Sequence, residues 1–415
     1  MKKYGCIGKK LTHSFSKEIH AMLADYNYEL IELNESEVKP FFDKKDFKAI
    51  NVTIPYKETV IEYLDFVSDT ASRIGAVNTI VNKGGKLYGF NTDYFGMKAL
   101  IEKTEVELKD KKVLILGTGG TSKTAQVLCR DLGASSIYVV SRSKKENCIT
   151  YEDATSSHTD ADVIINTTPS GMYPDCDSTP IDISVFKGLK GVIDAVYNPL
   201  TTNLIANARK NKIKAHCGLY MLVMQAVYAA EKFLDTQICV ETANEVYKNI
   251  LASKQNIVLT GMPGSGKSTI GRLININGFE FVDTDKEVEK QCGCSIKELI
   301  SEKGEKYFRD LETQVIREVS SKSCRIISTG GGAVLREKNV NYLKRNGKLF
   351  FIDADLKRLQ ATDDRPLSNT QEKLKELYLQ RYEIYKACAD VIVPDMATPE
   401  EEAEYILTKR LEQIL

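Results

Sequence analysis

At 415 residues the chain is longer than one hydrophobic core usually organises, which predicts two or three compact units. Its 42% apolar and 27% charged residues are typical of a globular protein, and no apolar run is long enough to cross a bilayer, which excludes a disordered or membrane-spanning chain. Lys plus Arg and Asp plus Glu each number 57, so the chain lacks the basic excess of proteins that bind nucleic acid or anionic membranes, and any anion site has to be local.

The ten cysteines are scattered rather than arranged as a disulfide framework, which favours a reducing compartment. The closest pair, Cys292 and Cys294, has no matching His or Cys pair nearby, so we interpret both as ordinary thiols and not as zinc ligands. The first residues lack the apolar segment of a signal peptide. We therefore expect a cytoplasmic protein.

Residues 1–98 predict a small mixed α/β unit, with helices around Glu18 and Tyr94 and strands at 28–33, 49–54 and 79–81. From residue 112, short apolar runs alternate with helix-like stretches, which indicates a parallel α/β sheet. These runs are 113–116, 137–140, 163–165 and 192–196.

Two helices are expected at 219–234 and 240–251, and a polar stretch follows at 252–256. The alternation of strands and helices then restarts, with strands at 257–259, 279–282, 325–327 and 349–352. We place a boundary between two α/β domains near residue 253.

A glycine-rich turn ends the strand at 113–116 and leads into a helix near Lys123. Its residues are Gly117, Thr118, Gly119, Gly120 and Thr121. Such a turn places the amide groups of a helix N-terminus where they can bind the pyrophosphate of a dinucleotide. The pattern differs from the common G-x-G-x-x-G and is a weak signal alone.

The residues at the end of the next strand indicate whether the domain binds NAD or NADP. NAD-binding folds usually carry an acidic residue there, whereas this chain has Ser141, Arg142 and Ser143 followed by two lysines. A basic cluster suits a 2′-phosphate, so we predict NADP; an exposed basic turn without a ligand is the alternative.

Lys57 follows the strand at 49–54, and Asp93 precedes a helix. Reduction of a ketone by hydride needs a proton donor, which Lys57 can supply if a carboxylate orients it. A lone lysine usually lies exposed on the protein surface, so only the following resemblance gives these residues a catalytic role.

Residues 4–250 resemble shikimate dehydrogenase. The resemblance is carried by motifs at 13–16, 51–57, 76–79, 91–93, 166–172, 194–199 and 218–225. It implies that Lys57 and Asp93 form the catalytic pair, and that hydroxyl and carboxylate groups of the substrate are bound by Ser14, Ser16, Thr53, Asn78, Tyr197 and Gln225. The implied NADP site comprises Gly117, Thr118, Gly119, Gly120, Thr121, Ser141, Arg142, Ser143, Ala195 and Gly218.

The second domain opens with a phosphate-binding loop at 261–268, between the strand at 257–259 and a helix. Its glycines let backbone N–H groups point at phosphates, Lys267 supplies a cation, and Ser268 offers a hydroxyl to Mg²⁺. Asp283 and Asp285 follow the next strand, where one can help to hold Mg²⁺ and the other can take a substrate hydroxyl; a turn or helix cap is the alternative.

Residues 256–415 resemble shikimate kinase. Besides the loop and the Asp pair, the resemblance is carried by Phe-Arg-x-x-Glu at 308–312, three glycines at 330–332, Arg-Pro-Leu at 365–367 and Arg-x-x-x-Tyr at 381–385. It implies that Asp285 is the base, that Arg309 and Arg381 bind the shikimate carboxylate beside Gly331, and that Arg365 closes over ATP. The implied site for ATP and Mg²⁺ comprises Asp283, Gly264, Ser265, Gly266, Lys267, Ser268 and Thr269.

Together these resemblances imply a shikimate dehydrogenase at 1–252, with a substrate lobe at 1–98 and 219–252 and a Rossmann-type NADP lobe at 99–218. A P-loop kinase of the nucleoside-monophosphate-kinase type follows at 253–415. The implied function is NADPH-dependent reduction of 3-dehydroshikimate to shikimate, followed by phosphorylation of shikimate by ATP on the route to chorismate. Oxidation of quinate or shikimate with NAD, or a binding module that has lost its chemistry, remain the alternatives.

Overall fold

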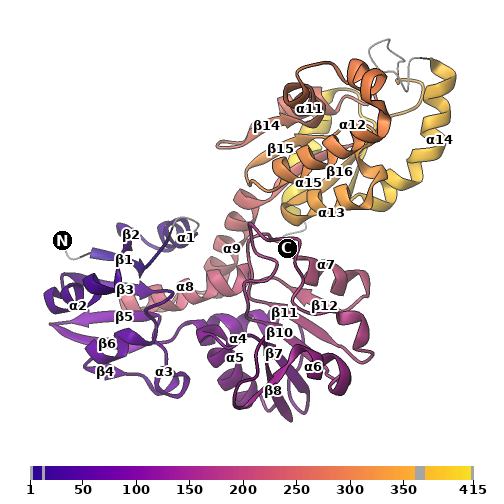
Figure 1. The fold of residues 1–415 in the computed structure, drawn as a ribbon. Coiled ribbons are helices and arrows are strands. Elements are labelled where there is room, and N and C mark those ends of the chain that lie inside the picture. The colour runs from indigo at the N-terminus through magenta and orange to yellow at the C-terminus, as the bar shows by residue number, and fades with distance from the viewer. Residues whose placement is uncertain (1–2, 12–14, 360–369, 413–415) are drawn as a thin grey trace. The chain divides into compact units, whose positions relative to one another are not determined.

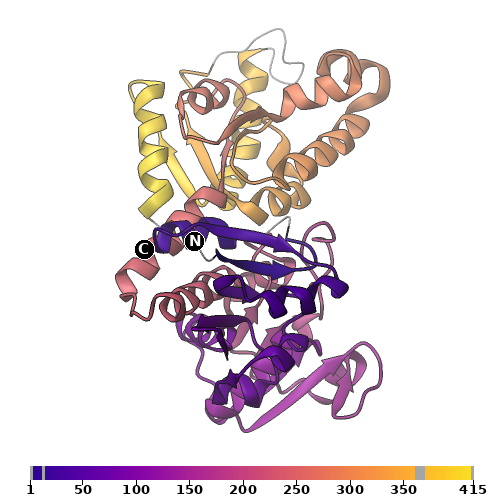
Figure 2. The same ribbon diagram turned by 90° about the vertical axis from the view of Figure 1, so that its left-hand side faces the viewer.

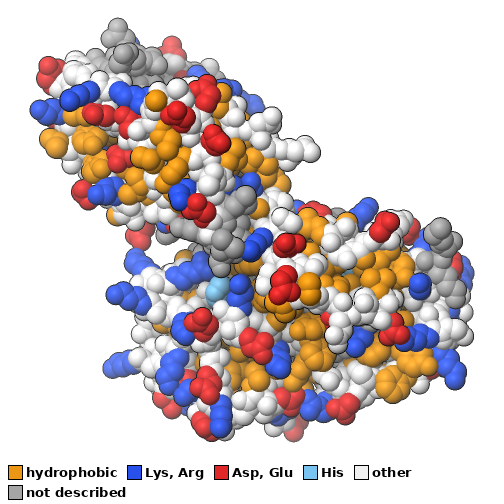
Figure 3. Space-filling view, turned by 180° about the vertical axis from the view of Figure 1, so that it is seen from behind, with side chains coloured by type: hydrophobic (Ala, Val, Ile, Leu, Met, Phe, Trp, Pro, Cys, Tyr) orange, Lys and Arg blue, Asp and Glu red, His pale blue; other side chains and the backbone are white. Residues whose placement is uncertain are grey.

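The chain divides into two compact units, Met1–Ile250 and Leu251–Leu415, in the computed structural model, which describes residues 3–11, 15–359 and 370–412 (Figure 1). Within those ranges, none of the helices combines the length and the apolar character that crossing a membrane requires. On the face shown in Figure 3, positive and negative side chains are interspersed, as the equal totals of 57 predict.

The first sheet of unit 1 has the strand order β2-β1-β3-β5-β6-β4 and is mixed, because β5 runs antiparallel to both β3 and β6. Gly84 and Gly85, with φ of +63° and +89°, turn the chain between β5 and β6. The strands are β1 (Lys3–Gly8), β2 (Tyr28–Glu32), β3 (Phe47–Val52), β4 (Phe66–Val67), β5 (Thr79–Lys83) and β6 (Lys86–Phe90). The helices beside them are α1 (Ser16–Leu23), α2 (Glu35–Lys44), α3 (Asp69–Ile74) and the 3-10 helix η1 (Thr59–Tyr63).

The second sheet of unit 1 is parallel throughout, with the order β12-β11-β10-β7-β8-β9. Its strands are β7 (Lys112–Leu116), β8 (Ser136–Ser141), β9 (Cys148–Thr150), β10 (Val163–Asn166), β11 (Gly191–Asp194) and β12 (Lys214–His216). Its helices are α4 (Asp93–Lys103), α5 (Gly120–Asp131), α6 (Tyr151–Ser157) and α7 (Asn203–Lys210), with the 3-10 helix η2 (Ile183–Val185). Helix α8 (Leu219–Leu234) packs on the first sheet through Ala229 and Phe233 and reaches the core of the second through Met221. The predicted parallel α/β sheet is confirmed.

Successive side chains of the parallel strands point to opposite faces of the sheet and pack in different apolar cores. Leu114 and Leu116 of β7 pack with residues of α6 and α7, whereas Val113 and Ile115 pack with residues of α4 and α5. A strand buried on both faces has to be apolar at every position, which explains the continuous runs in the sequence.

Unit 2 is built on a five-stranded parallel sheet of order β14-β15-β13-β16-β17, with helices on both faces (Figure 2). Its strands are β13 (Asn256–Thr260), β14 (Glu280–Asp283), β15 (Arg325–Ser328), β16 (Gly347–Asp353) and β17 (Val391–Pro394). Its helices are α10 (Lys267–Leu273), α11 (Thr284–Cys292), α12 (Ile296–Ser320), α13 (Glu337–Asn346), α14 (Gln371–Cys388), α15 (Pro399–Glu412) and the 3-10 helix η3 (Ala333–Leu335). Gly304, with φ of +82°, breaks α12 into two segments.

The polar residues at 252–256 do not form the linker expected between the helix and the next strand. Helix α9 (Val240–Lys254) continues to Lys254, and β13 begins at Asn256. Lys and Ser are tolerated in a helix when the apolar face of the preceding turns is buried, as Val246 and Ile250 are here.

Candidate active sites

A lysine–carboxylate pair lies in unit 1 between the end of β3 and the start of α4. Lys57 Nζ donates to Asp93 Oδ2 at 2.6 Å, and the two side chains are 18% and 11% exposed. Asp93 is the first residue of α4, where the helix dipole favours a negative charge. The pair is largely shielded from water, so the ammonium group is held in one orientation.

Asn78 connects this pair to α8. Its Oδ1 accepts a hydrogen bond from the backbone N–H of Thr92 at 2.7 Å, and its Nδ2 donates to Gln225 Oε1 at 3.5 Å. Helices α4 and α8 approach closely, since a Cβ added at Gly96 would lie 2.6 Å from the carbonyl oxygen of Met221. The structure therefore brings together Lys57, Asp93, Asn78 and Gln225.

The other predicted substrate residues of unit 1 lie on separate elements. Ser16 begins α1, Thr53 follows β3, and the Tyr197 ring packs edge-on against Phe15 with centroids 5.3 Å apart. Burial raises the pKa of Tyr197, so its hydroxyl remains a donor. Ser14 lies outside the described residues.

The glycine turn at the end of β7 has room for a phosphate group. Gly117 has φ of +104°, and a Cβ there would lie 2.9 Å from Thr168 Cγ2, so the turn requires glycine. At Gly119 and Gly120 an added Cβ would meet nothing within 4 Å, and α5 starts at Gly120. Thr118 and Thr121 complete this turn, whose open space and helix N-terminus fit a dinucleotide diphosphate.

The basic turn after β8 lies beside the glycine turn. Ser141 is buried, whereas Arg142 and Ser143 are exposed, and the Ser143 N–H donates to Ser141 Oγ at 3.4 Å. Lys145 Nζ donates to Thr118 Oγ1 at 3.1 Å and joins the two turns. Lys145 was not among the predicted site residues, although its place in the basic run was a signal.

A buried carboxylate supports the predicted residues at the end of β11. Asp194 accepts hydrogen bonds from Asn166 Nδ2 at 2.9 Å, Thr202 Oγ1 at 2.6 Å and the Val196 N–H at 3.0 Å. Burial raises its pKa to about 6. Ala195 lies against Gly218, where any Cβ would overlap the Ala195 carbonyl group. Asp194 therefore fixes the backbone at the end of β11, next to Ala195 and Gly218.

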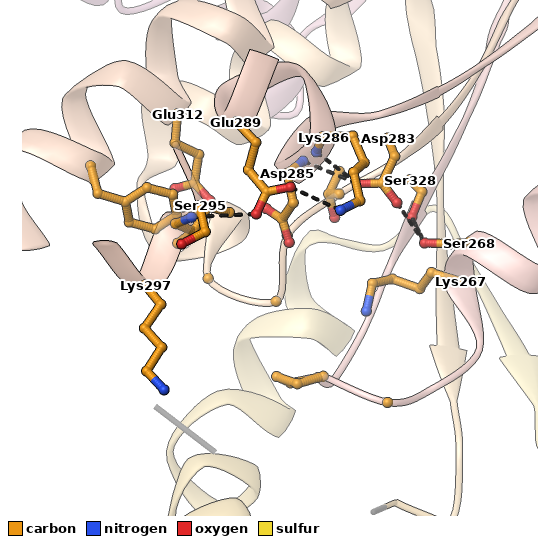
Figure 4. Close-up of a pocket in the computed structure, with 18 of the residues that line it drawn as sticks. Lys267, Ser268, Asp283, Asp285, Lys286, Glu289, Ser295, Lys297, Glu312 and Ser328 are labelled. Carbon is orange, nitrogen blue, oxygen red and sulfur yellow. Dashed lines mark hydrogen bonds and ion pairs between the residues drawn. The ribbon is translucent and has the colours of Figure 1, made fainter. Parts of the chain in front are cut away.

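Unit 2 contains a pocket of about 700 Å³ at the carboxyl ends of its strands (Figure 4). Gly264 and Gly266 have φ of +85° and +84°, and Lys267, the first residue of α10, donates to the carbonyl oxygens of Gly261 at 3.0 Å and Met262 at 2.8 Å. Ser265 is buried in the same loop, and Thr269 lies one turn into α10. In Figure 4 the side chains of Lys267 and Asp285 extend into the same space.

Ser268 and Asp283 form an oxygen-rich corner of this pocket. Ser268 Oγ donates to Asp283 Oδ2 at 2.6 Å and lies 3.1 Å from Ser328 Oγ. Asp283 Oδ1 also accepts from the N–H groups of Asp285 and Lys286, so the carboxylate caps α11 as well. Hydroxyl and carboxylate oxygens are ligands that suit Mg²⁺. Sequence reasoning missed Ser328, although its place at the end of β15 was a signal.

Asp285 is partly buried between the phosphate loop and the glycines at 330–332. Burial, followed by the negative charges of Glu312 and Asp283, raises its pKa to about 6. A Cβ added at Gly330 would overlap Asp285 Oδ1, so glycine is required for this packing. The Gly330 N–H donates to Thr284 Oγ1 at 3.0 Å.

Two guanidinium groups line the same pocket. Arg309 Nη1 donates to both carboxylate oxygens of Glu312, at 3.1 and 3.0 Å, and Arg381 Nη1 donates to the carbonyl oxygen of Gly331 at 3.2 Å. Tyr385 also donates to that carbonyl oxygen. The predicted kinase residues line this pocket, except Ser265, which is buried within the loop, and Arg365, which lies outside the described residues.

The geometry defines an oxidoreductase unit, with a glycine turn that fits a dinucleotide, and a kinase unit with a phosphate loop. A family model described as shikimate dehydrogenase substrate binding domain matches residues 6–80, and one described as shikimate kinase matches residues 263–411.

Solved and curated relatives agree over the first unit. Shikimate dehydrogenase (NADP(+)) of Clostridium beijerinckii is 38% identical over 255 residues, which cover 57% of this chain and 94% of the relative. The crystal structure of shikimate dehydrogenase 1 from Peptoclostridium difficile is 35% identical, with a TM-score of 0.56 over 60% of this chain and 98% of that one. The Thermus thermophilus shikimate 5-dehydrogenase in complex with NADP(H) and shikimate is 26% identical, with a TM-score of 0.54 over 60% and 99%.

Through its first unit the chain belongs to the shikimate dehydrogenase family, and a shikimate kinase domain follows in the same chain. The expected fold class and the two enzyme classes are confirmed.

Proposed function

We propose that residues 1–252 reduce 3-dehydroshikimate to shikimate with NADPH and that residues 253–415 phosphorylate this shikimate with ATP and Mg²⁺. The domain limits belong to the proposal, with a substrate lobe at 1–98 and 219–252 and an NADP lobe at 99–218. The observation that carries it is the presence, in one chain, of the Lys57–Asp93 pair and of a pocket that unites Lys267, Asp285 and both guanidinium groups.

For the reductase, NADPH supplies the hydride when bound. Lys57 donates a proton to the ketone oxygen as that oxygen becomes a hydroxyl, and Asp93 keeps the ammonium group aimed at it. Asn78 and Gln225 present amide groups that can bind the ring hydroxyls of the substrate.

For the kinase, ATP with Mg²⁺ supplies the phosphoryl group when bound. Ser268 and Asp283 would hold the cation, and Lys267 would stabilise negative charge on the phosphates. Asp285 accepts the proton of the attacking hydroxyl, while Arg309 and Arg381 bind the acceptor carboxylate through planar, charged hydrogen-bond donors.

Reciprocal variants test the two sites in one molecule. Lys57→Ala should lower reduction of 3-dehydroshikimate by about 10²-fold or more and leave phosphorylation of added shikimate unchanged, and Lys267→Ala should do the reverse. Each variant is the control for the other, because both activities are measured on the same sample. Loss of both activities in either variant would contradict separate sites.

Coupled turnover is tested by supplying 3-dehydroshikimate, NADPH, ATP and Mg²⁺ together. NADPH loss and ADP release should both depend on 3-dehydroshikimate, and without it ADP should appear only at background rate. NADPH loss without ADP would favour a binding module in unit 2.

Cofactor choice is tested at Arg142. An exposed guanidinium group at the end of β8 can pair with a 2′-phosphate, so Arg142→Gln should raise the KM for NADPH by about tenfold and leave the KM for NADH unchanged. Lys187→Gln, which removes an exposed cation from another loop of the unit, is the matched control. A wild-type enzyme that prefers NAD and quinate would instead favour the oxidative alternative.

A further inference from the structure

A Cys-Gly-Cys turn joins α11 to α12 beside the pocket of unit 2. Cys294 Sγ donates to Cys292 Sγ across 3.5 Å, and both side chains are partly exposed. Gly293, with φ of +74°, ends α11 and lets the chain turn back, and its N–H donates to the Glu289 carbonyl oxygen at 2.9 Å. The turn therefore holds the two thiols against each other.

This arrangement is compatible with a disulfide bond. Two residues of extended chain span at most about 7 Å, and disulfides join Cα atoms roughly 4.4 to 6.8 Å apart. The thiols need only a small movement to bond. The described part of the chain contains no group of three His, Cys, Asp or Glu side chains arranged to hold a metal ion, so a metal is a poor alternative occupant.

Both thiols are hydrogen-bond donors. The hydrogen bond to Cys292 is the largest cause that raises the pKa of Cys294, followed by burial. Cys292 Sγ donates to the carbonyl oxygens of Glu289 at 3.5 Å and of Cys294 at 3.2 Å. A thiolate is the attacking species in disulfide exchange, so whichever thiol loses its proton attacks first and the other resolves the intermediate.

The turn is tied to one wall of the acceptor pocket. Cys292 Sγ contacts the Glu289 carbonyl oxygen at 3.5 Å, and Glu289 Oε1 accepts from the Ile296 N–H at 3.3 Å. Glu289, Ser295, Ile296 and Lys297 all line the pocket, and Figure 4 shows three of them around it. Cys294 directly precedes Ser295, the N-cap of α12, so a bond that draws Cys294 toward Cys292 acts on the start of this wall.

We propose that Cys292 and Cys294 form a reversible disulfide, by exchange with a small disulfide such as glutathione disulfide, that weakens shikimate binding in unit 2. One cysteine attacks one glutathione sulfur as its thiolate, so a cysteine–glutathione disulfide forms and one glutathione thiolate leaves. The other cysteine, losing its proton, then attacks the Sγ of the first and releases the second glutathione. Two cysteine thiols are oxidised and one glutathione disulfide is reduced to two glutathione molecules. A disulfide in so small a ring is expected to be easily reduced, as regulatory disulfides are.

The experiment equilibrates the whole protein in glutathione buffers of graded ratio, blocks the remaining thiols by alkylation, and maps the peptides by mass. Kinase and dehydrogenase activities are measured on the same samples, and shikimate binding to unit 2 is measured by calorimetry as the part of the signal that Arg309→Gln removes. We expect a Cys292–Cys294 peptide that has lost two hydrogen atoms, a rise of about threefold or more in the kinase KM for shikimate, and reversal by dithiothreitol.

The variants Cys292→Ser and Cys294→Ser should remove the response, whereas Cys324→Ser, which removes another partly exposed thiol of the unit, should retain it. Glutathione adducts without the internal bond, or an internal bond that leaves shikimate binding and KM unchanged, would overturn the proposal. The activity readout rests on the proposed kinase function. A reduced protein that neither binds nor phosphorylates shikimate would refute that function, while the peptide map would still decide whether the disulfide forms.

Discussion

At the scale of single residues, burial determines how several ionisable groups behave. His20 is fully buried and stacks on Tyr28 with centroids 4.0 Å apart, and its Nδ1 lies 2.6 Å from the Tyr26 hydroxyl. Burial lowers the pKa of His20 from 6.5 to about 3. The folded chain therefore keeps this imidazole neutral at pH values where the unfolded chain protonates it.

This difference predicts acid destabilisation of unit 1. Between pH 6.5 and about 3 the unfolded state binds a proton that the folded state does not, so stability falls as the pH falls. His20 alone should make unit 1 about 2 kcal/mol less stable at pH 5 than at pH 8. Urea unfolding of the wild type and of His20→Phe, which keeps the ring stacking, measures this contribution.

The comparison with His20→Phe is needed because Asp194 titrates in the opposite sense. Its folded pKa of about 6 lies above the ordinary 3.8, so it adds stability as the pH falls through that range. The variant should differ from the wild type in the slope of stability against pH below 6.5. Equal slopes would contradict a neutral, buried His20.

At the scale of elements, the contact between α4 and α8 positions the reductase site. Asp93 begins α4 and Gln225 lies on α8, and Gly96 is where the two backbones meet. An alanine in a helix interior is ordinarily favoured over glycine by about 1 kcal/mol. Here its Cβ would lie 2.6 Å from the Met221 carbonyl oxygen, an overlap that only a shift of the helices relieves.

Gly96→Ala should therefore destabilise unit 1 by about 1 to 3 kcal/mol and lower dehydrogenase kcat/KM, without affecting the kinase. Thermal unfolding and both activity assays measure the effect. Gly188→Ala is the matched control, because an added Cβ there meets nothing within 4 Å. A Gly96→Ala protein as active and stable as that control would show that the contact is not tight.

Most central strands were predictable because they contain a continuous apolar run, as residues 113–116 of β7 and 257–259 of β13 do. Short strands were missed: β9 has no fully buried residue and β17 has only one, so neither shows a clear period. The residues at 252–254 were expected to be polar linker but lie in α9, since their polarity does not prevent a helix whose other face is buried.

The sites were predicted to a similar degree. Phosphate-loop residues are consecutive, so their pattern alone predicts a phosphate site. Lys57 and Asp93 are 36 residues apart, and only the resemblance to shikimate dehydrogenase predicted that they form a pair. Asp283 combines both earlier interpretations, because one oxygen caps α11 and the other accepts from Ser268. Ser328 lies 60 residues from Ser268 in the sequence and belongs to no motif, so the sequence did not predict that it joins this site.

At the scale of the whole molecule, each unit has its own apolar cores. Leu114 is fully buried in unit 1, and Phe350 is fully buried in unit 2. Truncation of such side chains to alanine costs about 3 to 5 kcal/mol, through lost burial and the cavity that remains.

Leu114→Ala should therefore lower the thermal stability of the dehydrogenase activity and leave that of the kinase unchanged, and Phe350→Ala should do the opposite. Residual activities after graded heating measure both outcomes on one sample. Parallel loss of the two activities in either variant would indicate that the units unfold as one.

The glycines at 330–332 also bear on how the kinase can evolve. Their backbone packs against Asp285 and Arg309. A mutation that adds a side chain at 330 would make it overlap Asp285, the proposed base, and one at 332 would make it overlap Arg309, the proposed ligand of the acceptor carboxylate. Selection for a different acceptor is therefore confined to walls that already carry side chains, such as Ile296 and Ile300. Descendants of this gene can diversify along that wall while the opposite one stays the same.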